Sequence, residues 1–151
     1  MKKLLLLIII AATMVTCKTN DKKTAGKEGG ENNRENAIAD SANYTTIQWL
    51  DSTFHDMGKV KQGDVVEVSF RFKNTGNKPL VIADVSAGCG CTVPEKPTEP
   101  YAPGKEGLIK AKFDSKNQAV GEHRKNVTVT ANTSPATTHL LSFRVDIQEK
   151  K

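Results

Sequence analysis

The length, composition and charge of the chain indicate a single domain and exclude nucleic-acid binding. Its 151 residues leave room for one domain rather than two, and its charged fraction of 26% is usual for a globular protein. Residues 44–151 hold 15 basic and 12 acidic residues, so the formal net charge of +5 falls to +3 there. These charges are spread between apolar segments, without the basic patch or stacking aromatic series that nucleic-acid binding requires.

The first sixteen residues have the three parts of an export signal. Lys2 and Lys3 form a positive start, residues 4–12 form an apolar run, and a short polar turn leads to Cys17. The apolar run is shorter than the ~20 residues that a membrane-spanning helix needs. We therefore predict a signal peptide over residues 1–16.

The cysteine directly after the apolar run resembles the cysteine of bacterial lipoprotein signals, which becomes the acylated N-terminus after cleavage. The resemblance covers "MVTC", in which Met14 and Thr16 differ from the Leu and the Gly or Ala usual at those positions. Each buried methylene of an acyl chain contributes about 0.8 kcal/mol, and stable anchoring needs more than one chain. The resemblance implies lipidation of Cys17 and a mature chain that is anchored to a membrane without spanning it.

Residues 17–43 differ in composition from the rest of the chain. They are rich in Lys, Glu, Asn and Gly and contain almost no apolar residues. Such a segment cannot bury enough apolar surface to offset the entropy of ordering. A helix through "ENNRENAIADSA" is the competing interpretation, but its Asn content and missing apolar stripe argue against it. We predict a flexible tether that holds the domain away from the membrane.

From residue 47 onward apolar and polar residues alternate, which is the period of a half-buried β-strand. The clearest case is "VVEVSFRFK", in which Val66, Val68, Phe70 and Phe72 share one face. About seven strands are expected, at residues 46–50, 54–60, 65–73, 80–87, 108–114, 125–131 and 140–148. The inward faces of the last three are Ile109, Ala111 and Phe113; Val127, Val129 and Ala131; and Leu141, Phe143, Val145 and Ile147.

Two segments interrupt this pattern. Residues 80–87 alternate less regularly, which a β-bulge would explain. Residues 94–107, "PEKPTEPYAPGKEG", contain four prolines and two glycines, so we expect no regular structure there. Seven strands separated by turn signals, with no helical periodicity after the tether, predict an all-β fold: an antiparallel β-sandwich over residues 44–151.

Three stretches of this domain resemble a known bacterial family. They are "FHDMGKVKQGD", "FRFKNTGNKPLVI" and "GCGCTVP" with the following "PYAPGKEGLIKAKFDS". Together they are similar to the domain of unknown function numbered 1573, an envelope module related to the hydin and major-sperm-protein type of sandwich. Met57 stands where that family usually has Phe, and a flexible thioether can fill the same apolar site. The resemblance spans residues 46–148 and implies an Ig-like β-sandwich, commonly on exported lipoproteins, with no assigned activity.

Cys89 and Cys91, either side of Gly90, are the candidate site residues beyond Cys17. Residues two apart in an extended strand have Cα atoms about 6.6 Å apart, so a disulfide requires the chain to pucker at the glycine. A bond closing so small a ring would be of the easily reduced class. Alternatively, the two cysteines are small buried side chains that continue the face of the preceding strand and have no chemical function.

A metal site is the third interpretation of the pair. Two thiolates on one face suit a soft ion, above all Cu(I), whereas zinc needs four ligands and a wider cysteine spacing. The three histidines, His55, His123 and His139, lie far from the pair in sequence. We expect them to be ordinary strand residues.

The sequence contains no motif of a metalloprotease, nucleophile elbow, P-loop or dinucleotide-binding turn, so we expect no enzyme. The first hypothesis is a lipid-anchored, non-enzymatic binding or scaffold module without a cofactor. We expect it in a bacterial cell envelope, on the outer membrane facing the periplasm. Its partner would be another envelope protein or a surface component, contacted through strand edges and residues 94–107. The alternative is copper binding or thiol–disulfide exchange at Cys89 and Cys91.

Overall fold

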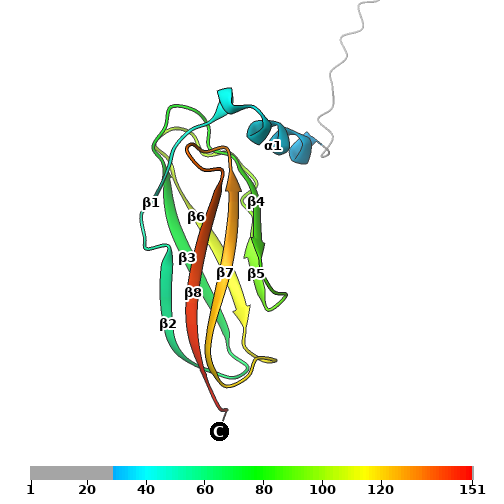
Figure 1. The fold of residues 1–151 in the computed structure, drawn as a ribbon, viewed down its shortest axis with the longest axis vertical. Coiled ribbons are helices and arrows are strands. Elements are labelled where there is room, and N and C mark those ends of the chain that lie inside the picture. The colour runs from blue at the N-terminus through cyan, green and yellow to red at the C-terminus, as the bar shows by residue number, and fades with distance from the viewer. Residues whose placement is uncertain (1–28, 151) are drawn as a thin grey trace, which may run out of the picture.

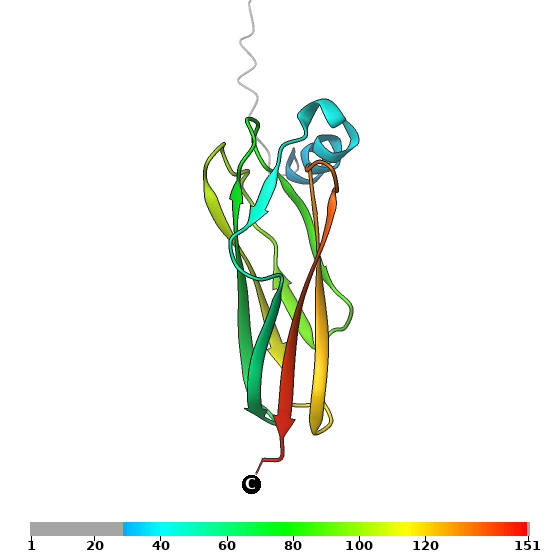
Figure 2. The same cartoon turned by 60° about the vertical axis from the view of Figure 1, so that its left-hand side comes forward.

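The computed structural model describes residues 29–150, and Figures 1 and 2 show it as an elongated two-layer sandwich. The expected signal peptide and the lipidation site Cys17 lie outside the described residues. The elements are α1 (Gly29–Ala39), a 3₁₀ turn η1 (Ser41–Asn43) and eight strands. The strands are β1 (Ile47–Trp49), β2 (Phe54–Lys61), β3 (Val65–Asn74), β4 (Ile82–Ala87), β5 (Thr92–Glu95), β6 (Glu106–Asp114), β7 (Gly121–Ala131) and β8 (Thr138–Gln148).

Four strands form each sheet, in the orders β1-β3-β6-β5 and β2-β8-β7-β4. All neighbouring strands run antiparallel except β2, which lies parallel to β8. This exception arises because β1 pairs with β3 in one sheet, and the chain then crosses to the edge of the other sheet before β2 begins. The all-β sandwich predicted from the alternation is therefore confirmed, with one parallel pair at an edge.

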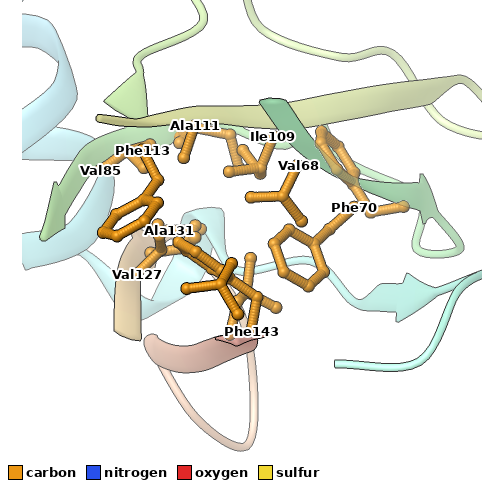
Figure 3. Close-up of a cluster of buried hydrophobic side chains, with 14 of the residues drawn as sticks. Val68, Phe70, Val85, Ile109, Ala111, Phe113, Val127, Ala131 and Phe143 are labelled. Carbon is orange, nitrogen blue, oxygen red and sulfur yellow. The ribbon is translucent and has the colours of Figure 1, made fainter. Parts of the chain in front are cut away.

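The core consists of the inward side chains of the two sheets (Figure 3). Phe70 and Phe72 from β3 and Phe143 from β8 are at most 1% exposed. All the residues predicted to face inward on β6, β7 and β8 are buried, and of those on β3 only Val66 remains partly exposed. On β4 the buried residues are Ile82 and Val85, three apart, because a register shift interrupts the pairing with β7. The predicted bulge is present.

One strand was not predicted from the sequence. Residues Thr92–Glu95 form β5, which pairs with Lys110–Phe113 of β6, although Pro94 and Glu95 fall within the segment predicted to have no regular structure. The reason is position: β5 is the outermost strand of its sheet, and a proline is tolerated there because its missing N–H can face away from the partner strand.

The flexible tether predicted over residues 17–43 is corrected for its second half, because α1 and η1 form within residues 29–43. Residues 17–28 lie outside the described residues. The helix lies at one end of the sandwich, and the C-terminus lies at the other (Figures 1 and 2). The guanidinium of Arg34 donates to the carbonyl oxygens of Ile82 and Thr98. The hydroxyl of Tyr44 donates to the carbonyl oxygen of Ile38 at 2.7 Å. These contacts with the domain stabilise the helix, whose own residues have a weak helix propensity. No helix within residues 29–150 has the length and apolar character needed to cross a membrane.

Candidate functional site

The Cys-Gly-Cys segment lies where the chain crosses from one sheet to the other. β4 ends at Ala87 on the edge of one sheet, and β5 begins at Thr92 on the edge of the other. The intervening turn is closed by the N–H of Thr92, which donates to the carbonyl of Cys89 at 3.2 Å. The carbonyl of Cys91 accepts from the N–H of Asp114 at 2.9 Å, which attaches the crossing to β6.

The two cysteines form a disulfide bond across this turn. Their Cα atoms are 5.3 Å apart, closer than the ~6.6 Å of an extended strand, so the chain puckers at Gly90. Of the three interpretations left open by the sequence, the structure contains the disulfide. In this bonded state the sulfurs present no thiolate to a soft metal ion.

The surroundings of the two sulfurs differ. Cys91 packs against the hydrophobic core and is half-buried. The Sγ atom of Cys89 lies 3.7 Å from the hydroxyl of Thr92, whose residue is only 3% exposed. Gly88 and Gly90 are exposed, and a Cβ atom at either would have no neighbour within 4 Å. Both cysteines are thus half-buried, and they differ in that Cys91 packs against the core whereas Cys89 is flanked by two exposed glycines.

The histidines take no part in this site. His123 bonds the carbonyl of Ala119 at 2.7 Å, His139 bonds the hydroxyl of Thr133 at 2.8 Å, and His55 packs on the ring of Phe70. Within the part of the chain that the structure describes, no three His, Cys, Asp or Glu residues gather as they would around a metal ion.

The strongest charge pairs belong to the surface of the sheets. Arg144 bonds Asp56 and Glu122, both at 2.6 Å. Arg71 bonds both carboxylate oxygens of Asp51 with its side chain, at 2.7–3.1 Å, and donates its backbone N–H to Oδ2 at 2.9 Å. These hydrogen bonds lower the pKa of Asp51 to about 2.

This pairing predicts a defined acid sensitivity. Because the pKa of Asp51 is lower in the folded state than its ordinary value of 3.8, the ionised pair stabilises the fold at neutral pH. That contribution is lost as the pH falls from about 4 towards about 2, since protonation then favours unfolding. Urea titrations over this range are expected to show a shallower loss of stability in Asp51→Asn than in the wild type. Arg71→Gln should flatten the slope in the same way, and an unchanged slope in either variant would contradict the assignment.

Family membership follows from a sequence comparison. The profile of the family described as "Protein of unknown function (DUF1573)" matches residues 47–147, which cover all eight strands but the last residue of β8. The chain belongs to this family. Comparison with curated proteins finds no match.

Several solved structures resemble this DUF1573 domain in fold. A protein of unknown function from Porphyromonas gingivalis W83 aligns with a TM-score of 0.61 and 17% identity, over 71% of this chain and 49% of that one. The PapD-like domain 7 of human CEP192 gives a TM-score of 0.53 and 11% identity, over 72% and 87% of the two chains. The secreted serine protease VesC from Vibrio cholerae gives 0.51 and 12%, over 68% of this chain and 23% of the protease. At these identities the likeness shows the Ig-like, PapD-like sandwich and no activity. The chain spans about half the length of the P. gingivalis protein.

Three glycines in the stretches that resemble the family are explained by the structure. A Cβ atom at Gly76 would lie 2.7 Å from the backbone nitrogen of Thr46. A Cβ atom at Gly107 would lie 2.6 Å from the ring of Phe72. Gly104 in "APG" has φ +78°, a conformation that L side chains rarely adopt. These three glycines allow close approach and a turn, so they are required by the fold.

Three buried polar residues were not singled out from the sequence. Asn74 and Ser115 are 0% exposed and Asn132 is 1% exposed. Asn74 occupies the next inward position after Phe72 on β3, and a polar residue at such a position indicates a hydrogen-bonding centre. The alternation of apolar and polar residues in β3 therefore already placed Asn74 on the inward face. Asn132 and Ser115 follow the ends of β7 and β6 and carry no comparable signal.

Proposed function

We propose that this DUF1573 chain is a lipid-anchored, non-enzymatic binding module of a bacterial cell envelope. Acyl chains on Cys17 would hold it at the outer membrane, facing the periplasm. The leader and its lipoprotein-like cysteine support the location. The binding role is supported by a recessed surface that combines apolar and charged side chains.

This surface, the loop-side patch, consists of Pro97, Tyr101 and Leu108 and is the observation that carries the proposal. These three residues line a hollow of about 240 Å³ together with Glu95, Lys96, Thr98 and Lys110. Leu108 is 42% exposed, and burial raises the pKa of the Tyr101 phenol. Protein-binding surfaces commonly combine apolar and charged side chains in this way.

The hollow exists because β5 is shorter than β6. β5 pairs only with Lys110–Phe113, so on the side of β6 away from β3, Leu108 has no neighbouring strand. The ring of Tyr101 packs edge-on against Phe72, 4.9 Å between centroids, and forms the floor next to Gly107. Tyr101 and Leu108 are thus held against the sheet, which limits the entropy that these two side chains lose on binding.

Strand addition at the sheet edges is the less favoured mode of binding. β1 has three residues, β5 has four and includes Pro94, and the pairings of β2 and β4 both contain register shifts. Short strands, prolines and bulges at edges reduce pairing with other chains. The side chains of the loop-side patch are therefore the more favourable contact, and the partner we propose is an envelope protein with an apolar side chain that fills the hollow.

The anchor is tested by metabolic labelling of the expressed full chain with a palmitate analogue. The wild type is expected to carry label and to sediment with membranes, whereas Cys17→Ser is expected to lose the label and the membrane association. The wild type and Cys17→Ser differ only outside the described domain, so the circular dichroism of the folded domain should be the same. An unlabelled wild type would contradict the anchoring.

The patch is tested by placing the photo-crosslinking residue p-benzoylphenylalanine at Leu108 in the native host. The control site is Leu140, which is 61% exposed on the other sheet. We expect a discrete adduct with one envelope protein from position 108 and none from 140, and loss of that partner from detergent extracts of Leu108→Glu. Equal adducts at both positions, or none at 108, would contradict the binding surface.

A further inference from the structure

We propose that the Cys89–Cys91 bond is a thiol–disulfide exchange site whose substrates are dithiols of other exported proteins. This activity is separate from binding at the loop-side patch. The bond joins residues only two apart, so it connects no distant parts of the fold. A disulfide stabilises chiefly by shortening the loops of the unfolded chain, and this one encloses a single residue. A structural role therefore does not account for it.

The backbone around the bond is held by other interactions. β4 pairs with β7, β5 pairs with β6, and the N–H of Asp114 fixes the carbonyl of Cys91. Reduction breaks none of these hydrogen bonds. The turn can then alternate between a bonded and a dithiol state while the two sheets stay in place.

An incoming thiolate reaches the bond more easily on the side of Cys89. Both cysteines are half-buried, but Cys89 has an exposed glycine on each side, whereas Cys91 packs against the core. The hydroxyl of Thr92, 3.7 Å from the Sγ atom of Cys89, can donate to a thiolate formed there. A hydrogen bond to the charged form favours it. Cys89 is accordingly the exchanging sulfur and Cys91 the resolving one.

The exchange has two balanced steps. A substrate thiolate attacks Sγ of Cys89, forming a mixed disulfide, and the broken Sγ–Sγ bond leaves its electron pair on Cys91, which takes up a proton. The second substrate thiolate attacks the substrate sulfur of that mixed disulfide and expels the Cys89 thiolate beside Thr92. The substrate dithiol has lost two electrons and become a disulfide, and the Cys89–Cys91 pair has gained them. A disulfide-bearing oxidant of the envelope would restore the bond.

The first test uses the mature chain in detergent, with reduced ribonuclease A as the dithiol substrate. Acid quenching, alkylation and intact-mass analysis are expected to show one disulfide gained by the substrate for each chain reduced. The double variant Cys89→Ala/Cys91→Ala should transfer none while its circular dichroism and thermal midpoint match the reduced wild type. No transfer by the wild type, or a double variant or reduced wild type that unfolds, would overturn the proposal.

The second test assigns the roles of the two sulfurs. The single thiol of Cys91→Ser is expected to react with Ellman's reagent at least tenfold faster than that of Cys89→Ser, and Thr92→Val should reduce this advantage. Equal rates would overturn the assignment of Cys89. The reduced wild type is also incubated with Cu(I), and its intact mass is measured. If it retains one copper and transfers no disulfide to ribonuclease, the site is a metal site and the exchange proposal is wrong. Neither test depends on the crosslinking at Leu108, so the two proposals fail separately.

Discussion

Replacing Phe143 by alanine is expected to lower the free energy of unfolding by about 3–5 kcal/mol. Phe143 lies on β8, between β2 and β7, and is 0% exposed. Its ring meets that of Phe113 from the opposite sheet edge-on, 5.9 Å between centroids, and projects into the core cluster (Figure 3). The substitution removes this contact between the layers and leaves a cavity that the surrounding strands, fixed by their hydrogen bonds, cannot fill. Urea unfolding of the chain from residue 18 measures the loss.

Phe54→Ala is the matched control, because Phe54 lies on β2 of the same sheet and is 38% exposed. Its contact is with the guanidinium of Arg124, 5.2 Å from the ring centroid, at the surface. We expect this variant to lose no more than about 1 kcal/mol. Similar losses in the two variants would mean that Phe143 is not part of the close-packed core described above.

The strands of the core could be predicted because each buries only one face. β3, β6, β7 and β8 show alternation over most of their length, and the inward phase read from the sequence matches the buried residues from Val68 to Ile147. The pairing of the strands carries no such signal. That β2 runs parallel to β8 depends on where the chain crosses between sheets, and local periodicity does not report this.

The elements that sequence reasoning missed are those held by contacts with distant parts of the chain. α1 has no apolar stripe, and its Arg34 is positioned by carbonyls 48 and 64 residues away. β5 has only four residues and a proline, so its strand character comes from β6. Propensity and composition describe a segment alone, and tertiary contacts decided both cases.

The sequence located the candidate site, but it did not show whether the two cysteines form a disulfide, bind a metal or are simply buried. The Cys-Gly-Cys spacing allowed a disulfide, a metal ligand pair or two buried side chains. The face of Val85 and Ala87 would have continued to both cysteines if β4 did not end at Ala87. Whether Gly90 puckers depends on the crossing between the sheets, which the topology determines. The predicted contact segment, residues 94–107, contains Pro97 and Tyr101 of the loop-side patch. The hollow itself could not be predicted, because it arises from the unequal lengths of β5 and β6.

The second large effect is expected at Asn74, the fully buried residue that ends β3. Its side-chain N–H groups donate to the carbonyls of Lys78 and Tyr101, at 2.7 and 2.9 Å. Its side-chain oxygen accepts from the hydroxyl of Thr45 at 2.9 Å and from the N–H of Gly76 at 3.1 Å. One amide therefore joins the turn after β3, the segment before β1 and the loop that leads to β6.

Asn74→Ala removes these four hydrogen bonds, of which the one from Thr45 is buried and the other three are part-buried. Each unsatisfied buried group costs about 1–3 kcal/mol, so we expect a total loss of at least about 3 kcal/mol in urea unfolding. Asn74→Asp keeps the accepting oxygen but loses both donors and turns a carboxylate towards two carbonyls, and should be at least as damaging near pH 7. Asn126→Ala, at an exposed position on β7, should stay within about 0.5 kcal/mol of the wild type. If Asn74→Ala were as stable as Asn126→Ala, the buried amide would not be what joins the three segments, and the Asn in the family's "NTG" stretch would need a different explanation.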